Sequence, residues 1–387
     1  MGHGNLAVML YGIHANFLHL PLIWVIGKAF NREDIFKIGF VFLVTTIPNT
    51  YLMKLQFDDP YAWVSKGVGM DSGGQLDGGS GKIRPPGLFT FITGNNMFYP
   101  LAAAFLLMYF LEPRKLKIYT WGVIAMSAIC IILAQPLSIS RTMMLATGIV
   151  IVSFVAAMAV LVAQGKVPGG KFFGFLTVAI FASCLLYFFV PEFQDGIKAF
   201  SNRWEAATGE KKGGVESAIV ARFFSGFTNA IKYTQYTAGF FGSGIGMGTN
   251  VGSRFLTGEV SFLLAEDEWG RLVLEMGALF GMSFILMRVI LTIHLGIFAL
   301  RQFLVTKNAV PFLVMSAAGL PVLQGQLGSS TMLGFTVIGA GFLLASGNIE
   351  QPEEEEDYFD EDEEEEDPYK GEIAGRANRK RLLAEHR

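Results

Sequence analysis

The chain has 387 residues, of which 52% are hydrophobic and 16% charged, and its mean hydropathy is +0.44. One soluble core could not bury that much apolar surface, so the composition argues against an ordinary soluble enzyme. The two cysteines, Cys130 and Cys184, lie inside apolar runs, and no Cys/His spacing typical of a metal site is present. We therefore expect a membrane protein without a structural disulfide, metal or cofactor, and without a nucleic-acid partner.

The net charge of −3 averages two regions of opposite sign. Residues 350–387 carry 16 acidic and 6 basic side chains, whereas residues 1–349 carry 17 acidic and 24 basic ones. The acidic segment is of low complexity and contains too few apolar residues to form a core. We expect an integral membrane domain over 1–349 and a disordered cytoplasmic tail over 350–387.

Nine apolar runs are each close to the ~20 residues that a helix needs to cross the hydrocarbon core, although the last two are short. They predict an all-α, polytopic transmembrane bundle. The runs are 6–27, 36–53, 88–111, 118–136, 142–164, 171–190, 272–299, 311–328 and 331–347.

Basic residues in alternate connectors assign the two sides of the membrane, since Lys and Arg accumulate on the cytoplasmic side. The other connectors, 54–87, 137–141 and 191–271, then face outside, and 191–271 is the large extracytoplasmic loop. The first run consequently begins outside, which leads us to expect further helices before it. The basic residues that set the cytoplasmic side are Lys28, Arg32, Lys37, Arg114, Lys115, Lys117, Lys166, Lys171, Arg301 and Lys307.

Residues 240–255, FFGSGIGMGTNVGSRF, form a glycine-rich stretch in the large loop. A dinucleotide fingerprint would need a strand before the glycines, but the preceding VESAIVARFFSGFTNAIKYTQY has helical periodicity. No Walker lysine follows either, so a nucleotide loop is excluded. Two interpretations stay open: a flexible hinge, or an anion-binding turn whose backbone N–H groups, at Gly244 and Gly246, face a ligand.

Five arginines fall at the predicted outer face, several of them next to apolar sequence, where a guanidinium is costly unless it meets water or an anion. Arginine suits phosphate because its planar fork donates two hydrogen bonds at once. Each could instead be a surface charge, and Arg271 could pair with Asp267 or Glu275, four residues away on either side. The five are Arg84, Arg141, Arg222, Arg254 and Arg271.

Acidic residues cluster where the large loop enters the next span, in LLAEDEWGRLVLEMGALFG. Crowded carboxylates near an apolar phase suit a general base, for which Glu266 and Glu268 are the candidates. The alternative is a helix N-terminus, where acids satisfy free N–H groups. That alternative explains Glu275 poorly, because Glu275 lies further along and shares a helix face with Glu268.

Taken in order, four of these segments resemble the bacterial O-antigen polymerase and O-antigen ligase superfamily. The similarity covers roughly residues 80–290, and it lies in the order of the motifs and the side of the membrane that they share. The segments are IRPPGLFTFITGNNMFYPLA, SISRTMML, ARFFSGFTNAIKY followed by FFGSGIGMGTN, and EDEWGRLVLEMGALFG.

The resemblance implies a metal-independent membrane glycosyltransferase of the GT-C type in a bacterial inner membrane, acting at the periplasmic face. Its substrate would be an oligosaccharide on undecaprenyl diphosphate, and its partners a flippase or chain-length regulator. Arg141 and Arg222 would hold the diphosphate, helped by Arg84 and Arg254, and Glu266 or Glu268 would deprotonate the acceptor hydroxyl.

Polymerisation and ligation remain alternatives. In the ligase branch a histidine precedes the glutamate of the E-x-G motif by nine residues, whereas this chain has Glu266 there, which favours a polymerase. A transporter would show broken helices with ionisable groups near the bilayer midplane. A scaffold with a docking tail would leave the outer arginines unexplained.

Overall fold

The computed structural model describes residues 3–59, 77–79, 82–112, 116–209, 225–235, 239–259 and 263–348. By its internal contacts the chain divides into two units, 1–349 and 350–387. The second unit, and with it the predicted tail, lies outside the described residues.

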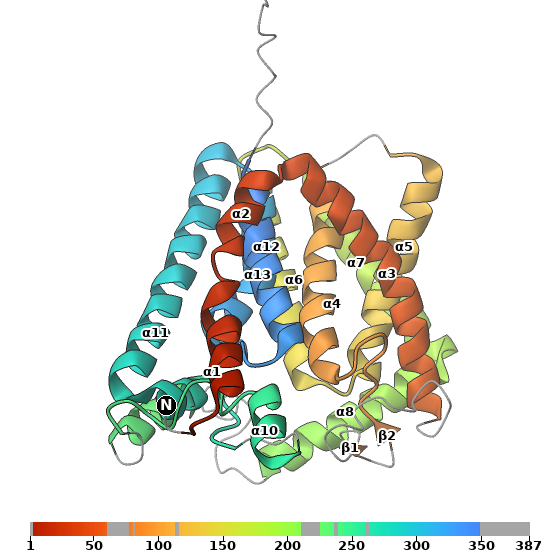
Figure 1. The fold of residues 1–387 in the computed structure, drawn as a ribbon. Helices are drawn as coiled ribbons and strands as arrows, with labels where there is room; N and C mark the ends of the chain where they lie inside the picture. Colours follow the sequence, from red (N-terminus) through yellow and green to blue (C-terminus); the bar gives the residue numbers. More distant parts are fainter. Residues whose placement is uncertain are drawn as a thin grey trace, which may run out of the picture. The chain divides into compact units, whose positions relative to one another are not determined.

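The described residues are predominantly helical, with one short antiparallel hairpin (Figure 1). A further helical stretch covers 225–235. The elements are α1 (Leu6–Ile13), the π-helix η1 (His14–Leu18), α2 (Leu22–Ala29), α3 (Arg32–Asp58), β1 (Asp77–Gly79), β2 (Lys82–Ile83), α4 (Ile92–Leu111), α5 (Ile118–Leu137), α6 (Arg141–Ala163), α7 (Gly169–Phe189), α8 (Pro191–Gly209), α10 (Asn250–Thr257), α11 (Glu268–Arg301), the π-helix η4 (Gln302–Thr306), α12 (Val310–Gln324) and α13 (Ser330–Ala345).

Each of the nine apolar runs is largely helical, and this agrees with the expected all-α helical membrane protein. In the described part of the chain, five helical segments are long and apolar enough to cross a membrane: 6–29, 32–58, 118–137, 141–163 and 268–306. A sixth arises if residues 176–189 and 191–202, which meet at 98°, count as one bent span.

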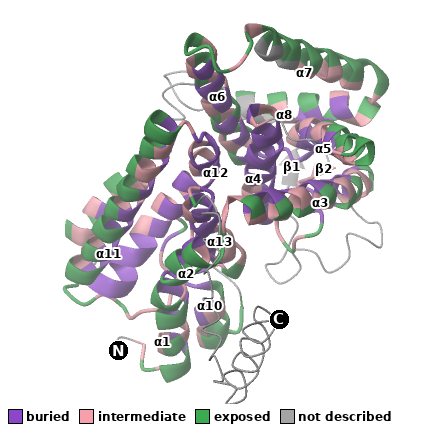
Figure 2. Ribbon diagram, turned by 90° about the horizontal axis from the view of Figure 1, so that it is seen from above, coloured by how far each residue is buried: buried purple, intermediate pink, exposed green. Residues whose placement is uncertain are grey.

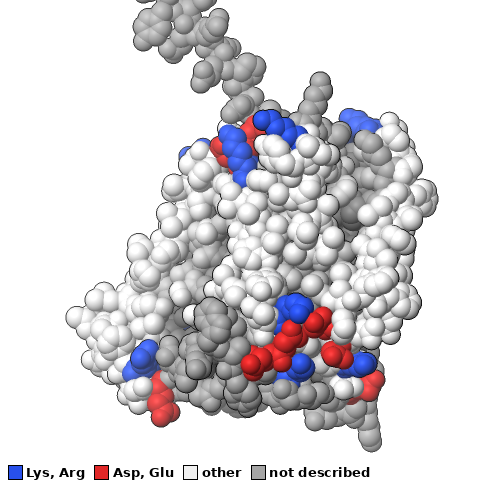
Figure 3. All heavy atoms as spheres, turned by 90° about the vertical axis from the view of Figure 1, so that its right-hand side faces the viewer, with Lys and Arg blue, Asp and Glu red and all other residues white. Residues whose placement is uncertain are grey.

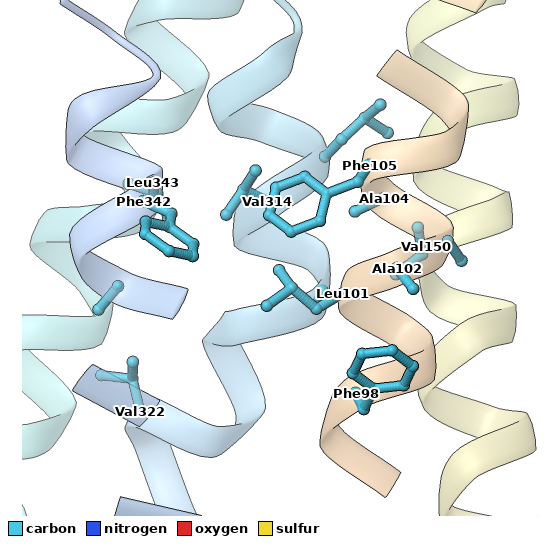
Figure 4. Packing of buried hydrophobic residues seen from close by; sticks show 14 of the residues in the cluster. Phe98, Leu101, Ala102, Ala104, Phe105, Val150, Val314, Val322, Phe342 and Leu343 are labelled. Carbon is cyan, nitrogen blue, oxygen red and sulfur yellow. The ribbon is translucent and has the colours of Figure 1, made fainter. Parts of the chain in front are cut away.

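Helix α4 forms the centre of the bundle. Nearly all of its residues are buried, from Ile92 to Leu111, and it packs against α3, α6, α12 and α13. Figure 4 shows Phe98, Leu101 and Phe105 of α4 facing Val314 of α12 and Phe342 of α13. By contrast α7 lies at the periphery, with none of its described side chains buried (Figure 2).

Charged residues lie at the two ends of the helices. On the face shown in Figure 3 they form an upper and a lower group, with an uncharged band between them. We call the end that carries the glycine stretch 239–249 the loop end, and the end at which α3 begins and α11 finishes the far end. An apolar band between charged ends is what a bilayer requires of a membrane-embedded protein.

Helix α11 is two helices joined at Gly277, where φ is 80° and ψ 177°. In a straight helix Glu268 and Arg288 would be about 30 Å apart. Their side chains nevertheless meet at 3.0 Å, and Gly281 lies directly against the backbone of Leu272 and Val273. The chain must therefore fold back on itself at Gly277.

This fold-back alters the prediction of one continuous span over 272–299. The amino half of α11 (268–276) is a short helix, buried from Gly270 to Gly277, that turns back against the carboxyl half (278–301). The break needs glycine, because other residues do not adopt this backbone conformation and because a Cβ would collide with the carbonyl oxygen of Phe240.

Helices α12 and α13 form a hairpin that enters from the far end and turns at residues 325–329. Their 15 and 16 residues correspond to about 22–24 Å, less than the ~30 Å of a hydrocarbon core. The turn meets the amino half of α11: Trp269 Nε1 donates to Leu323 O at 3.1 Å. The turn of the α12–α13 hairpin and the amino half of α11 thus meet end to end.

Candidate functional site

A buried cluster of four charges joins the amino half of α11 to its carboxyl half. Arg271 Nε donates to Glu268 Oε2 at 2.8 Å, and Arg271 NH1 lies 2.8 Å from Glu275 Oε2. Arg288 NH1 reaches Glu268 Oε1 at 3.0 Å. All four side chains are at most 4% exposed, and their formal charges cancel. We call Glu268, Arg271, Glu275 and Arg288 the ion cluster.

Glu275 holds the glycine stretch. Gly246 N donates to Glu275 Oε2 at 3.1 Å and Gly248 N to Glu275 Oε1 at 2.7 Å, while Gly244 N donates to the Glu275 main-chain oxygen. The loop therefore is an anion-binding turn in its geometry, and the anion is a carboxylate of the same chain. In this arrangement Gly244 and Gly246 bind the protein itself, which is also why the stretch is not a free hinge.

Arg288 caps the end of α12. Its Nε donates to Val322 O at 2.9 Å, and its NH2 donates to Pro321 O and Gly325 O at 3.1 and 2.9 Å. The last carbonyls of a helix have no partner within the helix and carry partial negative charge, so a guanidinium suits them. Together with Leu327 N, which donates to Glu268 at 3.1 Å, these bonds fix the α12–α13 turn to the ion cluster.

The first helical segment is joined to the ion cluster by Asn16. This residue lies in the π-helix η1, where Asn16 Nδ2 donates to Gly12 O at 2.8 Å and Asn16 Oδ1 accepts from Arg271 NH2 at 2.9 Å. Gly12 itself lies against the backbone of Gly246, a position with no room for a Cβ. The ion cluster therefore ties together α1, the glycine loop, both halves of α11 and the α12–α13 turn.

A second polar region, built around the first turns of α4, holds the chain neighbours of two of the predicted arginines, Arg84 and Arg141. Asn95 Nδ2 donates to Pro85 O at 3.1 Å, directly after Arg84, and Ser140 Oγ donates to Asn96 Oδ1 at 2.6 Å, directly before Arg141. Two connectors more than 50 residues apart in sequence are thus anchored on consecutive asparagines of one helix.

The surroundings of this second region favour an anion. Helices α4 and α6 both begin there, and helix N-termini present free N–H groups and partial positive charge. Ser140 caps α6 through Met143 N at 3.3 Å, which places Arg141 at the first helical position. Arg84 and Arg141 are both partly exposed. We call these two residues, with Asn96 and Ser140, the arginine region.

The two candidate bases differ in accessibility. Glu268 is 3% exposed and accepts from Arg271, Arg288 and Leu327 N. Glu266, two residues earlier, is exposed, and its main-chain oxygen accepts from Gln326 of the α12–α13 turn. Only Glu266 can meet a substrate hydroxyl without breaking the ion cluster.

The remaining predicted residues lie elsewhere. Arg254 is exposed on α10, and Arg222 is outside the described residues. Arg271 belongs to the ion cluster. Of the two partners that the sequence suggested, Glu275 does pair with it, but Asp267 does not, and Glu268 is its second partner. Asp267 instead caps α11 by accepting from Gly270 N at 2.8 Å.

Two residues of the ion cluster's network were missed by the sequence reasoning. Arg288 had a signal, because an arginine in the middle of an apolar run is costly and needs a partner. Asn16 had none, since a single amide in the first run points to no particular neighbour. Among the described residues, no group of three or more His, Cys, Asp or Glu side chains is placed to hold a metal ion.

Comparison with protein-family models, curated proteins and solved structures gave no match. The resemblance noted above therefore rests on this chain's motifs alone.

Proposed function

We propose that this protein is a membrane glycosyltransferase that uses a polyprenyl-diphosphate-linked oligosaccharide as donor, and that it polymerises the repeat units into a surface polysaccharide. The observation that carries the proposal is the arginine region. Arg84 and Arg141 belong to separate connectors, and the residue next to each in the chain is held by one of two consecutive asparagines of α4, close to where α4 and α6 begin. A diphosphate is the ligand class that suits two guanidiniums and two positive helix ends.

In the proposed reaction the acceptor hydroxyl oxygen attacks the anomeric carbon of the donor sugar. The bond from that carbon to the diphosphate oxygen breaks, and the lipid diphosphate leaves with the bonding electron pair. Arg84 and Arg141 stabilise the charge that develops on the leaving group. Glu266 takes the proton of the hydroxyl, because it is the exposed carboxylate beside the α12–α13 turn.

The ion cluster supports this chemistry without taking part in it. Glu268 and Arg288 hold the α12–α13 turn, and Gln326 of that turn holds the backbone of Glu266. Phe335, shortly after the turn, contacts Phe89 at a ring separation of 5.9 Å, and Phe89 lies on the connector that carries Arg84. Helix α13, which follows the turn, thus contacts the connector that carries Arg84.

A direct test incubates the purified protein with undecaprenyl-diphosphate-linked oligosaccharides in the presence of EDTA and separates the products on a gel. The proposal predicts a ladder of lengthening chains. A single transfer to a lipid or protein acceptor would show a ligase, the close alternative. No product from a folded sample, across a panel of oligosaccharides, would contradict the proposal.

Two variants sharpen the test. Arg141→Ala should lose product formation. Arg141→Lys should keep only part of it, because lysine cannot make a bidentate hydrogen bond to phosphate. Lys166→Ala is the matched control: it removes an exposed basic side chain from the far end. Normal ladders from Arg141→Ala would remove this residue from the site.

One observation favours a transporter as a second candidate. The first helical segment is interrupted by η1, and α11 is broken at Gly277, with ionisable groups beside both breaks. Discontinuous helices of this kind occur at substrate sites of transporters. The charges here neutralise one another, whereas a transported ion would need one of these carboxylates. Transport would be supported if vesicles containing the protein show an ion flux and the Glu275→Gln variant abolishes that flux.

A further inference from the structure

At the far end of α11 a groove lies on the surface of the helix. It has a volume of about 360 Å³ and is lined by the last turns of α11 together with η4. Its walls combine apolar side chains with a basic and polar rim. The lining residues are His294, Ile297, Phe298, Arg301, Gln302, Val305 and Thr306.

The groove carries positive charge without a matching carboxylate. No acidic side chain lines it, and Arg301 has no ion-pair or hydrogen-bond partner among the residues that the structure describes. Described carboxylates at this end have partners of their own: Glu112 pairs with Arg32, Asp34 with Lys37 at 3.2 Å, and Glu33 also has a partner. An anion is therefore the complementary ligand for Arg301.

An apolar stripe leads away from this rim along the same helix. Exposed side chains follow one another at helical spacing, and each is more than half exposed. They are Leu286 at 59%, Ile290 at 58%, Ile293 at 56% and Ile297 at 53%. Residues spaced by three and four lie on one face of a helix, so the stripe is continuous. Its length, about 16 Å, is the size of a lipid acyl chain segment within one leaflet.

We propose that this groove binds an anionic phospholipid, with the headgroup phosphate at Arg301 and an acyl chain along the stripe from Ile297 to Leu286. Arg301 supplies the charge-assisted hydrogen bonds, and Gln302, Thr306 and His294 supply polar contacts at the rim. The stripe distinguishes a lipid from a soluble phosphate, since only a lipid gains from covering it. This site is separate from the arginine region and does not depend on the proposed glycosyl transfer.

The position agrees with the physics of a membrane boundary. The carboxyl half of α11 supplies the crossing, and Arg301 closes it at the far end, where the positive-inside rule predicts the cytoplasmic leaflet. Anionic headgroups are concentrated at that surface, and each basic residue near it adds about 1 kcal/mol of attraction.

The test is native mass spectrometry of the full chain in detergent with equimolar phosphatidylglycerol and phosphatidylcholine. We expect a wild-type preference for one phosphatidylglycerol, and an affinity about fivefold lower in Arg301→Ala. Arg301→Lys should keep most of the preference. Lys117→Ala, which removes one exposed charge from the same end, is the matched control and should leave the preference unchanged.

A second variant tests the acyl-chain part. Ile293→Ser together with Ile297→Ser shortens and polarises the stripe at exposed positions, so the fold should be unaffected while lipid retention falls. Glycerol phosphate added in excess should not displace the lipid. Displacement by glycerol phosphate, an unchanged preference in Arg301→Ala, or no wild-type preference would each overturn the proposal.

Discussion

Two glutamates separated by one residue have opposite roles at the loop end. Glu268 is enclosed by two arginines and a backbone N–H, whereas Glu266 is exposed beside the α12–α13 turn. A carboxylate enclosed in this way is out of reach of a substrate hydroxyl, so it makes a poor base. Burial and ion pairing therefore distinguish Glu266 from Glu268, which the sequence alone proposed as equal candidates for the general base.

We predict that Glu266→Gln and Glu268→Gln fail in different ways. Glu266→Gln should lower glycosyl transfer by roughly 10²–10⁴-fold with an unchanged melting temperature, because it removes the proposed base and no packing. Glu268→Gln should destabilise the fold by about 3–5 kcal/mol, since it leaves two buried arginines with one carboxylate.

Activity assays and thermal unfolding of both purified variants check this pair. A fully active Glu266→Gln enzyme would assign the base to another residue. A Glu268→Gln protein as stable as wild type would mean that the ion cluster does not hold the loop end together.

At the scale of elements, the break in α11 is the feature on which the loop end depends. It returns the chain on itself so that Glu268 meets Arg288, and it places Gly277 against Phe240 and Gly242. Without the break, the amino half would continue the span outward, and the α12–α13 turn would lose Trp269 and Glu268.

We predict that Gly277→Ala destabilises the protein by at least 3 kcal/mol, because alanine is strained at this backbone conformation and its Cβ would collide with Phe240 O. Gly148→Ala, in the interior of α6, is the control. A Cβ there meets nothing, so the substitution should be neutral or stabilising by about 0.5–1 kcal/mol.

Thermal unfolding followed by circular dichroism compares the two glycine variants. Equal melting temperatures for Gly277→Ala and wild type would show that the helix passes through residue 277 without a sharp turn.

Apolar runs were sufficient to predict the helices, because a crossing helix needs only length and hydrophobicity. They predicted α3, α5 and α6 to within a few residues. They could not reveal that 268–276 turns back, since LVLEMGALFG is equally apolar on both sides of Gly277. Likewise, the sequence did not predict that Glu275 contacts the glycine stretch, because that contact depends on the fold-back.

At the scale of the whole molecule, the positive-inside rule predicts that the loop end lies outside and the far end in the cytoplasm. We predict that a cysteine at Glu259 on the loop end reacts with a membrane-impermeant maleimide in intact spheroplasts. A cysteine at Lys37 on the far end should react only after permeabilisation. Both side chains are exposed, and the background needs Cys130 and Cys184 replaced by serine.

Labelling of both positions from the same side would contradict the topology, and reversed labelling would place the arginine region in the cytoplasm. The second result would also exclude a reaction at the outer face.

We propose that the charges of the loop end form two sets, an ion cluster that holds the fold and an arginine region that binds a diphosphate. The most direct test is the affinity of the purified protein for undecaprenyl diphosphate, measured with the melting temperature of each variant. We predict that Arg84→Ala and Arg141→Ala each weaken binding by about tenfold, as expected for one lost charge-assisted contact of ~1.4 kcal/mol, with melting temperatures unchanged. Unchanged affinity in both variants would contradict the account.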